Sequence, residues 1–192
     1  MGRVRTFIAV DVGKAIRHRL VGLQETLAEA GTAIKWVEPE NLHVTLLFLG
    51  EVDEREVPGV CKLVAQETAR HADFTMSVET VGCFPHARRP RILWAGVGHG
   101  TQELCALHDG LEPPLEELGY RREERRYTPH ITLGRVTSDR ATSALVQALA
   151  GQAGWKGGEI EVADLQVMSS QLTPKGPVYT VMSRARFAKD EG

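Results

Sequence analysis

The chain of 192 residues carries 25 acidic side chains against 23 Lys and Arg, for a net charge of −2 at pH 7. This balance excludes a protein that binds nucleic acid over its whole surface, because such binding depends on excess positive charge. No apolar run approaches the roughly 20 residues of a membrane-spanning helix, and we expect no signal peptide. The three cysteines, Cys61, Cys83 and Cys105, lack metal-binding spacing, so we expect buried apolar roles for them in a reducing cytoplasm and no metal site.

Hydrophobic periodicity predicts strands and helices along the whole chain. In order, we expect a strand at 4–11, a helix at 14–30, strands at 34–37 and 42–49, a helix at 54–71, strands at 74–83 and 91–97, a helix at 102–118, strands at 122–127 and 130–136, a helix at 139–150, and strands at 159–170 and 177–187. No linker or low-complexity segment interrupts this order. A single domain over 1–192 is therefore expected.

A pattern of His, an apolar residue, Thr and Leu occurs twice, beginning at His43 and at His130. The offset is 87 residues (130 − 43), and the same shift carries the apolar run 4–10 onto 91–97. It also aligns the helical pattern that follows each of these runs. A common order of elements under one shift indicates a duplicated α/β half, with two lobes related by an approximate two-fold axis. Such an axis would place one motif on each side of a central cleft.

Each motif places an imidazole and a hydroxyl on one face of a strand, because residues i and i+2 point the same way. His43 and Thr45 form one pair, and His130 and Thr132 form the other. A single histidine in an apolar strand is more often a hydrogen-bonded core residue, but its recurrence with Thr at one spacing favours a shared polar site. Two imidazoles can supply a general acid and a general base, and the hydroxyls can donate to phosphate oxygens. Metal-free phosphodiester chemistry fits these residues best.

Arginines gather at two places near the motifs. Arg88, Arg89 and Arg91 surround one predicted loop, and Arg121, Arg122, Arg125 and Arg126 precede the second motif, interleaved with two glutamates. For either group, contact with phosphate and a solvated surface remain open. Arg135 is the better candidate for contacting a bound anion. On a regular strand it would point away from His130, so this role requires the strand to end or bulge there.

With these motifs, the segments at 5–10, 36–50, 90–97, 129–135 and 176–179 resemble the two-histidine phosphoesterase superfamily over nearly the whole chain. The branch that they resemble is the LigT-like RNA 2′,3′-cyclic phosphodiesterases, also called 2′-5′ RNA ligases. The resemblance implies an α+β fold, bilobal and duplicated, with two antiparallel sheets lining a central cleft and helices outside. It implies one LigT-like domain over 1–192.

The resemblance also implies an activity and roles for individual residues. A terminal 2′,3′-cyclic phosphate of RNA, such as the end of a tRNA fragment, would be hydrolysed to a 2′-phosphomonoester, with reversible 2′-5′ joining. His43 would be the proton donor and His130 the proton acceptor, while Thr45, Thr132 and Arg135 would hold the substrate. We expect no cofactor, a monomer and a cytoplasmic location. Two alternatives stay open: another cyclic phosphate, such as ADP-ribose 1″,2″-cyclic phosphate or a 2′-5′ oligonucleotide, and a non-catalytic module that binds RNA ends.

Overall fold

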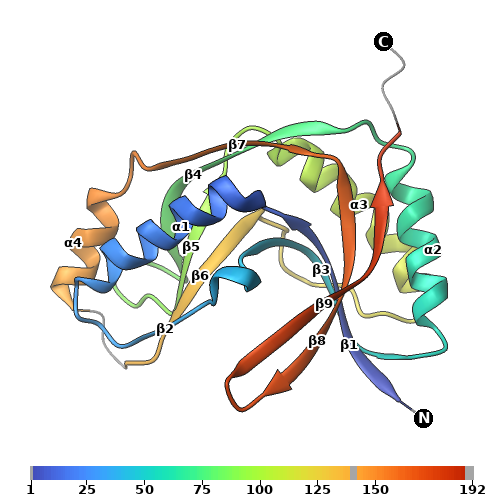
Figure 1. Ribbon diagram of the computed structural model, residues 1–192, viewed down its shortest axis with the longest axis horizontal. Coiled ribbons are helices and arrows are strands. Elements are labelled where there is room, and N and C mark those ends of the chain that lie inside the picture. Colours follow the sequence, from blue (N-terminus) through green and yellow to red (C-terminus); the bar gives the residue numbers. More distant parts are fainter. Residues whose placement is uncertain (1, 139–141, 189–192) are drawn as a thin grey trace.

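A computed structural model describes residues 2–138 and 142–188 (Figure 1). Strands outnumber helices, and the elements follow one another in an order close to that predicted. They are β1 (Arg3–Asp11), α1 (Gly13–Ala28), β2 (Ile34–Trp36), the short helix η1 (Pro39–Asn41), β3 (His43–Asp53), α2 (Val57–Thr68), β4 (Phe74–Phe84), β5 (Ile92–Val97), α3 (Thr101–Glu117), β6 (His130–Val136), α4 (Ser143–Gly151), β7 (Lys156–Val162), β8 (Asp164–Thr173) and β9 (Gly176–Arg186).

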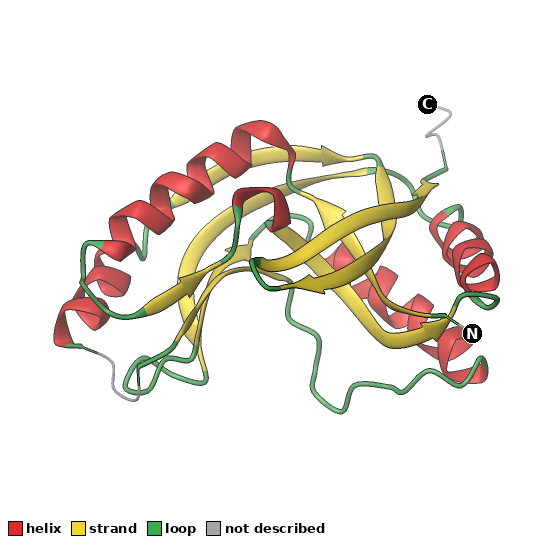
Figure 2. Cartoon of the chain, turned by 60° about the horizontal axis from the view of Figure 1, so that its bottom comes forward, coloured by secondary structure: helices red, strands yellow, loops and turns green. Residues whose placement is uncertain are grey.

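The strands form one curled antiparallel sheet (Figure 2) in the order β7-β4-β5-β6-β3-β1-β8-β9, with β2 paired to β6. The α+β fold class is confirmed. The two expected sheets are the halves of this one sheet, and they join where β3 pairs with β6 through Val44 and Ile131. These two residues are themselves 87 apart (131 − 44), so the axis relating the halves passes through their pair.

The helices cover the two halves of the sheet as two pairs. In Figure 1, α1 and α4 lie together on the left, and α2 and α3 lie together on the right. Each helix turns an apolar stripe toward the strands, so that Leu20 and Leu107, for example, are buried beside Val44 and Ile131 in one core. Because side chains alternate along a strand, burying Val44 and Ile131 leaves their neighbours on the other face of the sheet.

Two predicted elements are wrong in detail. Residues 122–127 form no strand, since five consecutive charged residues, Arg122–Arg126, supply no apolar face to bury, and they lie exposed. The single strand predicted over 159–170 is two strands that break at Ala163. There the chain crosses between the halves, because β7 pairs with β4 whereas β8 pairs with β1. The first residues of the predicted helix 139–150 lie outside the described residues.

Candidate active site

The central strand pair places both motifs on one face of the sheet. Val44 pairs with Ile131 in antiparallel register, and extending this register by one residue each way sets His43 opposite Thr132 and Thr45 opposite His130. Val44 and Ile131 are fully buried, whereas the four motif residues are each partly exposed on the opposite face. Directly opposite side chains in such a pair have Cβ atoms about 5 Å apart. The four polar groups therefore form one compact site.

Backbone carbonyls orient both imidazoles in the same way. Nδ1 of His43 lies 2.6 Å from the carbonyl oxygen of Asn41, and Nδ1 of His130 lies 2.7 Å from that of Thr128. A carbonyl can only accept a hydrogen bond, so each Nδ1 carries the proton and each neutral ring keeps the lone pair on Nε2. Nε2 of His43 lies 2.7 Å from the Thr45 hydroxyl. In both rings the nitrogen available for proton transfer is thus Nε2.

Each histidine also packs against an aromatic ring. Tyr179 of β9 meets His43 edge-on at a centroid distance of 5.5 Å, and Phe84 of β4 meets His130 edge-on at 5.1 Å. Phe7 supports the first pair, 5.1 Å from His43 and 4.9 Å from Tyr179. These contacts fix the planes of the imidazoles. These aromatic residues come from strands other than those of the two motifs, so sequence reasoning assigned them no role, although Phe7 and Tyr179 lie in the segments 5–10 and 176–179.

Burial lowers the pKa of His43 from its ordinary value of 6.5, and nearby charges modify the effect. The hydrogen bond to the Asn41 carbonyl and the carboxylate of Asp11 raise the pKa, while the charge of His130 lowers it further. Asp11 pairs with His43 across β1 and β3, and it also binds the guanidinium of Arg17 at 2.5 Å. An effect of His130 on the pKa of His43 agrees with the strand register, which sets the two motifs against each other.

A bulge in each central strand brings a third residue to this face. In β6, Trp94 pairs with Thr132 and Leu93 pairs with Gly134, so Leu133 is an extra residue and the alternation of faces changes after it. Arg135 is thereby turned from the buried side to the side of His130 and is exposed. Its positive charge, with that of Arg5, acts on the Tyr179 hydroxyl, whose pKa burial raises.

The same irregularity occurs in β3, where Phe7 pairs with Phe48 and Ala9 with Thr45. Phe48 is turned to the side of His43 and Thr45, and its ring lies 5.6 Å from that of Phe7. Phe48 and Arg135 are equivalent under the repeat (135 − 48 = 87). One half of the site thus adds an aromatic ring to its His and Thr, and the other half adds a cation.

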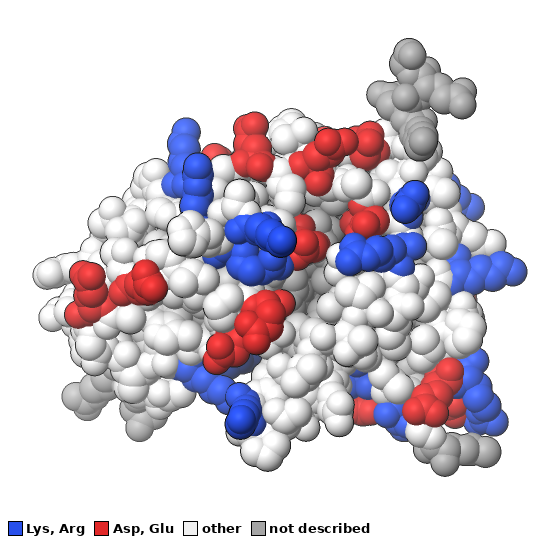
Figure 3. Space-filling model, in the orientation of Figure 1, with Lys and Arg blue, Asp and Glu red and all other residues white. Residues whose placement is uncertain are grey.

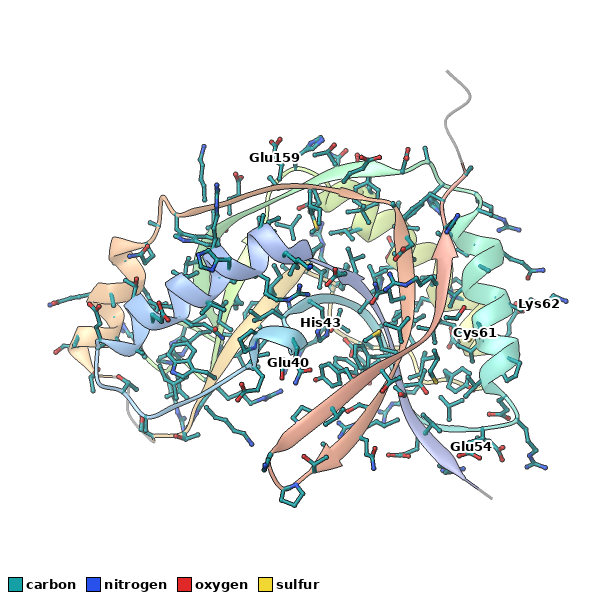
Figure 4. The ribbon with its side chains drawn as sticks, viewed as in Figure 1. Glu40, His43, Glu54, Cys61, Lys62 and Glu159 are labelled. Atoms are coloured by element: carbon teal, nitrogen blue, oxygen red, sulfur yellow. The ribbon has the colours of Figure 1, made fainter. Side chains whose placement is uncertain are left out.

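Asn41 is a further residue that sequence reasoning missed. Its carbonyl orients His43, and its buried side-chain amide donates to the carbonyl of Pro177 at 2.9 Å. Pro177 lies two residues before Tyr179, so Asn41 ties the β8–β9 hairpin to the histidine that the hairpin covers. Figure 4 shows His43 near the centre of the molecule, close to the point where β8 and β9 cross, with Glu40 beside it. The only available signal was that Asn41 lies two residues before His43.

The other residues considered from sequence lie away from this site or are engaged elsewhere. Of the remaining histidines, His18, His86 and His99 are exposed at the surface. His108 is not a surface residue, since it is buried beneath Tyr127 with its ring stacked at 4.4 Å. The three cysteines, Cys61, Cys83 and Cys105, are only half-buried, and burial raises the pKa of each thiol.

Charged groups of both signs are mixed over the surface in view. Figure 3 shows Lys and Arg side chains interspersed with Asp and Glu over the face in view, with no continuous basic surface. Within residues 2–138 and 142–188, no three His, Cys, Asp or Glu side chains come together in a way that could hold a metal ion. Of the helices in that same part of the chain, none is long and apolar enough to cross a membrane.

Comparison with known proteins identifies relatives along the whole chain. The family model described as LigT like Phosphoesterase matches residues 10–94 and again 97–179, and the two matches start 87 residues apart (97 − 10). An RNA 2′,3′-cyclic phosphodiesterase of Archaeoglobus fulgidus is 38% identical over 92% of this chain and 96% of its own. One of Methanothermobacter thermautotrophicus is 34% identical over 96% of this chain and 100% of its own.

Solved structures show the same fold. A crystal structure of a Thermus thermophilus protein superposes with a TM-score of 0.82 at 29% identity, over 97% of this chain and 100% of the other. Escherichia coli LigT in its apo form superposes with a TM-score of 0.79 at 24% identity, over 98% and 99% of the two chains. The curled sheet with its two helix pairs is thus the architecture of these proteins.

Proposed function

Because this chain belongs to the LigT-like phosphoesterase family, we propose that it hydrolyses terminal 2′,3′-cyclic phosphates of RNA to 2′-phosphomonoesters. The observation that carries the proposal is the pairing of Val44 with Ile131, which sets the two His-Thr pairs against each other across the local two-fold axis. Relatives at 34% and 38% identity carry the name of this activity. No cofactor is required by the chemistry that follows.

The opposed imidazoles suit an in-line displacement at phosphorus, in which the entering and leaving oxygens lie on opposite sides. His130 takes a proton from the attacking water through Nε2, and the water oxygen forms a bond to phosphorus. The bond from phosphorus to the 3′-oxygen breaks, and Nε2 of His43 donates the proton that this leaving oxygen needs. Water supplies the hydroxyl of the new phosphate, so the reaction balances with no other reactant. Each proton transfer contributes roughly 10²–10⁴-fold to the rate.

The lowered pKa of His43 is compatible with its role as the donor. Burial weakens its hold on a proton, which makes the imidazolium a stronger acid once it is formed. A bound phosphate anion favours the charged form of a neighbouring imidazole, so the substrate itself promotes protonation of His43. Thr45, Thr132 and Arg135 hold the non-bridging oxygens in this scheme, since two hydroxyls and a guanidinium stabilise charge that persists through the transition state.

The same site can also use a nucleophile other than water. If the 5′-hydroxyl of a second RNA replaces water as the nucleophile, the product is a 2′-5′ linkage, and the two histidines keep the same roles. We propose RNA ends that carry 2′,3′-cyclic phosphate as the partners, tRNA fragments among them. We further propose that the protein works as a monomer, since one chain already contains both motifs, and in the cytoplasm, where its three free cysteines would stay reduced.

A product analysis tests this function. An oligoribonucleotide ending in 2′,3′-cyclic phosphate is incubated with the protein, and the product is compared with 2′- and 3′-phosphate standards by chromatography. We expect the 2′-phosphate alone, with ADP-ribose 1″,2″-cyclic phosphate and a 2′-5′ oligonucleotide turned over more slowly in parallel reactions. A His43→Ala, His130→Ala double variant prepared in the same way controls for contaminating nucleases. A 3′-phosphate product, or preference for either of the other substrates, would overturn the proposal.

A further inference from the structure

The connection between α3 and β6 carries an exposed run of arginines and glutamates, Arg121–Arg126, which we call the arginine loop. Figure 2 shows this connection as the long loop along the lower edge of the molecule. Six consecutive exposed residues with no regular structure would ordinarily form a solvated surface segment. The contacts at the two ends of the loop indicate a more definite placement.

Three side-chain contacts fasten the loop. At its start, the hydroxyl of Tyr120 donates to Glu56 at 3.1 Å, and Arg122 pairs with Glu112 of α3 at 3.0 Å. At its end, the hydroxyl of Tyr127 donates to the backbone carbonyl of Thr45 at 2.9 Å. The last contact joins the loop directly to the strand that carries the first motif. The loop is therefore held at a fixed position relative to the phosphate site.

Between these contacts the loop faces Phe48 across a groove of about 620 Å³, lined also by Leu49 and Gly50. Phe48 lies three residues beyond Thr45 on the face of the motifs, and 52% of its surface is exposed. An exposed aromatic ring next to a phosphate site offers a surface on which a base can stack. The groove therefore begins where a terminal nucleotide would lie and leads away from it beneath the loop.

The arginines along the groove differ in whether they already form an ion pair. Arg121 and Arg125 line it and form no ion pair or hydrogen bond with any residue of the described chain, while Arg122 is neutralised by Glu112. Glu123 and Glu124 line the same groove and oppose an approaching phosphate. Arg121 and Arg125 also line the cavity on the other side of the loop, but there they face Asp109, Glu112 and Glu116 of α3, so the side toward Phe48 is the less acidic of the two and the better one for an anion.

We propose that this groove binds the single-stranded RNA that precedes the cyclic phosphate, with Arg121 and Arg125 contacting its backbone phosphates. The proposal rests on the function proposed above and adds a preference for oligonucleotides over a mononucleotide. Arginine contacts to phosphate and stacking on an aromatic ring are the two interactions by which proteins follow a single strand without reading its sequence. The arginine loop therefore favours longer RNA over a mononucleotide, and the histidines act on the terminal phosphate of that RNA.

The test compares a ten-nucleotide RNA ending in 2′,3′-cyclic phosphate with a single nucleoside 2′,3′-cyclic phosphate. For the wild-type protein we expect kcat/KM to be at least about tenfold higher on the ten-nucleotide RNA. Arg121→Gln with Arg125→Gln should raise KM for that RNA about 2- to 30-fold, in line with two exposed charge contacts, and change kcat less. The slope of log KM against log salt should fall by about 1.4, or 0.7 for each lost phosphate contact.

Neutralising the acidic side chains of the groove sharpens the test. Glu123→Gln with Glu124→Gln should lower KM for the ten-nucleotide RNA, because it removes repulsion from the same groove. The matched control for the arginine variant is Lys62→Gln with Arg70→Gln, two exposed cations of the α2 region; Figure 4 shows Lys62 pointing away from His43. This control changes net charge by the same amount and should leave the length preference intact.

The possible failures can be told apart. If neither substrate is turned over by the wild-type protein, the proposed function fails. If both are turned over with equal kcat/KM, the function stands and the inference is overturned. It is also overturned if the arginine variant loses activity equally on both substrates. If circular dichroism shows that the arginine variant does not fold, the inference is still tested in two ways. One is the dependence of kcat/KM of the wild-type protein on RNA length and salt, and the other is the KM of the glutamate variant.

Discussion

Replacing Thr45 with Val removes the hydroxyl that lies 2.7 Å from Nε2 of His43 and keeps the shape of the side chain. The fold should not change, because Val favours strands and the hydrogen bond from Tyr127 is made to the backbone carbonyl of Thr45. The whole effect then falls on the site. A hydrogen bond to a charged phosphate oxygen is worth about 1.5–3 kcal/mol, so kcat/KM should fall roughly 10- to 150-fold.

The assay is the rate of opening of a 2′,3′-cyclic phosphate end at substrate concentrations well below KM. Thr132→Val, the equivalent change in the other half, should lose activity to a similar degree. The control is Thr75→Val, which makes the same substitution at an exposed position of β4 away from the site and should change kcat/KM by about twofold at most. If Thr45→Val loses no more activity than Thr75→Val, the hydroxyl does not hold a charged oxygen and the division of roles between His and Thr is wrong.

Three further predictions concern the histidines and metals. His43→Ala and His130→Ala should each lose roughly 10²–10⁴-fold in kcat, and the double variant should be little worse than either single one. Each single variant should also lose one limb of the bell-shaped pH profile. A double variant whose loss equals the product of the two single losses would contradict the paired roles of the histidines. Turnover should survive EDTA, and rescue of chelated protein by Mg²⁺ would contradict it. The unfolded chain protonates His43 near 6.5 and the folded protein only at lower pH, so stability should fall as pH drops below about 6.5. Denaturant unfolding at pH 7.5 and pH 5 measures this: between the two pH values, the free energy of unfolding should fall less for His43→Gln than for the wild-type protein.

The face that carries the chemistry could be predicted from the sequence because strand alternation is a local property. His43 and Thr45 share a face whatever surrounds them, and so do His130 and Thr132. The repeat of 87 residues further indicated that the two pairs are equivalent. An offset relates positions along the chain and measures no distance, so the pairing of Val44 with Ile131 that brings them together is visible only in the folded sheet.

The segments where prediction was wrong are those in which tertiary contacts outweigh local pattern. The run Arg122–Arg126 was expected as a solvated edge strand, but it has no apolar face to bury, and the hydrogen bonds of Tyr120 and Tyr127 hold it as a loop instead. The sequence has no strong turn signal at Ala163. The strand breaks there because β7 and β8 pair with strands in different halves of the sheet.

The sequence by itself therefore determined the motifs, their chemistry and the duplication, all of which depend on residue type and spacing. Only the tertiary structure decided what surrounds them. Tyr179 and Phe84 reach the histidines from distant strands, and Asn41 ties a hairpin 136 residues away to His43. The bulge at Leu133 that turns Arg135 toward the site is set by how β6 pairs with β5. Contacts between segments far apart in the chain produce no hydrophobic periodicity in either segment. They can therefore be seen only in the folded structure.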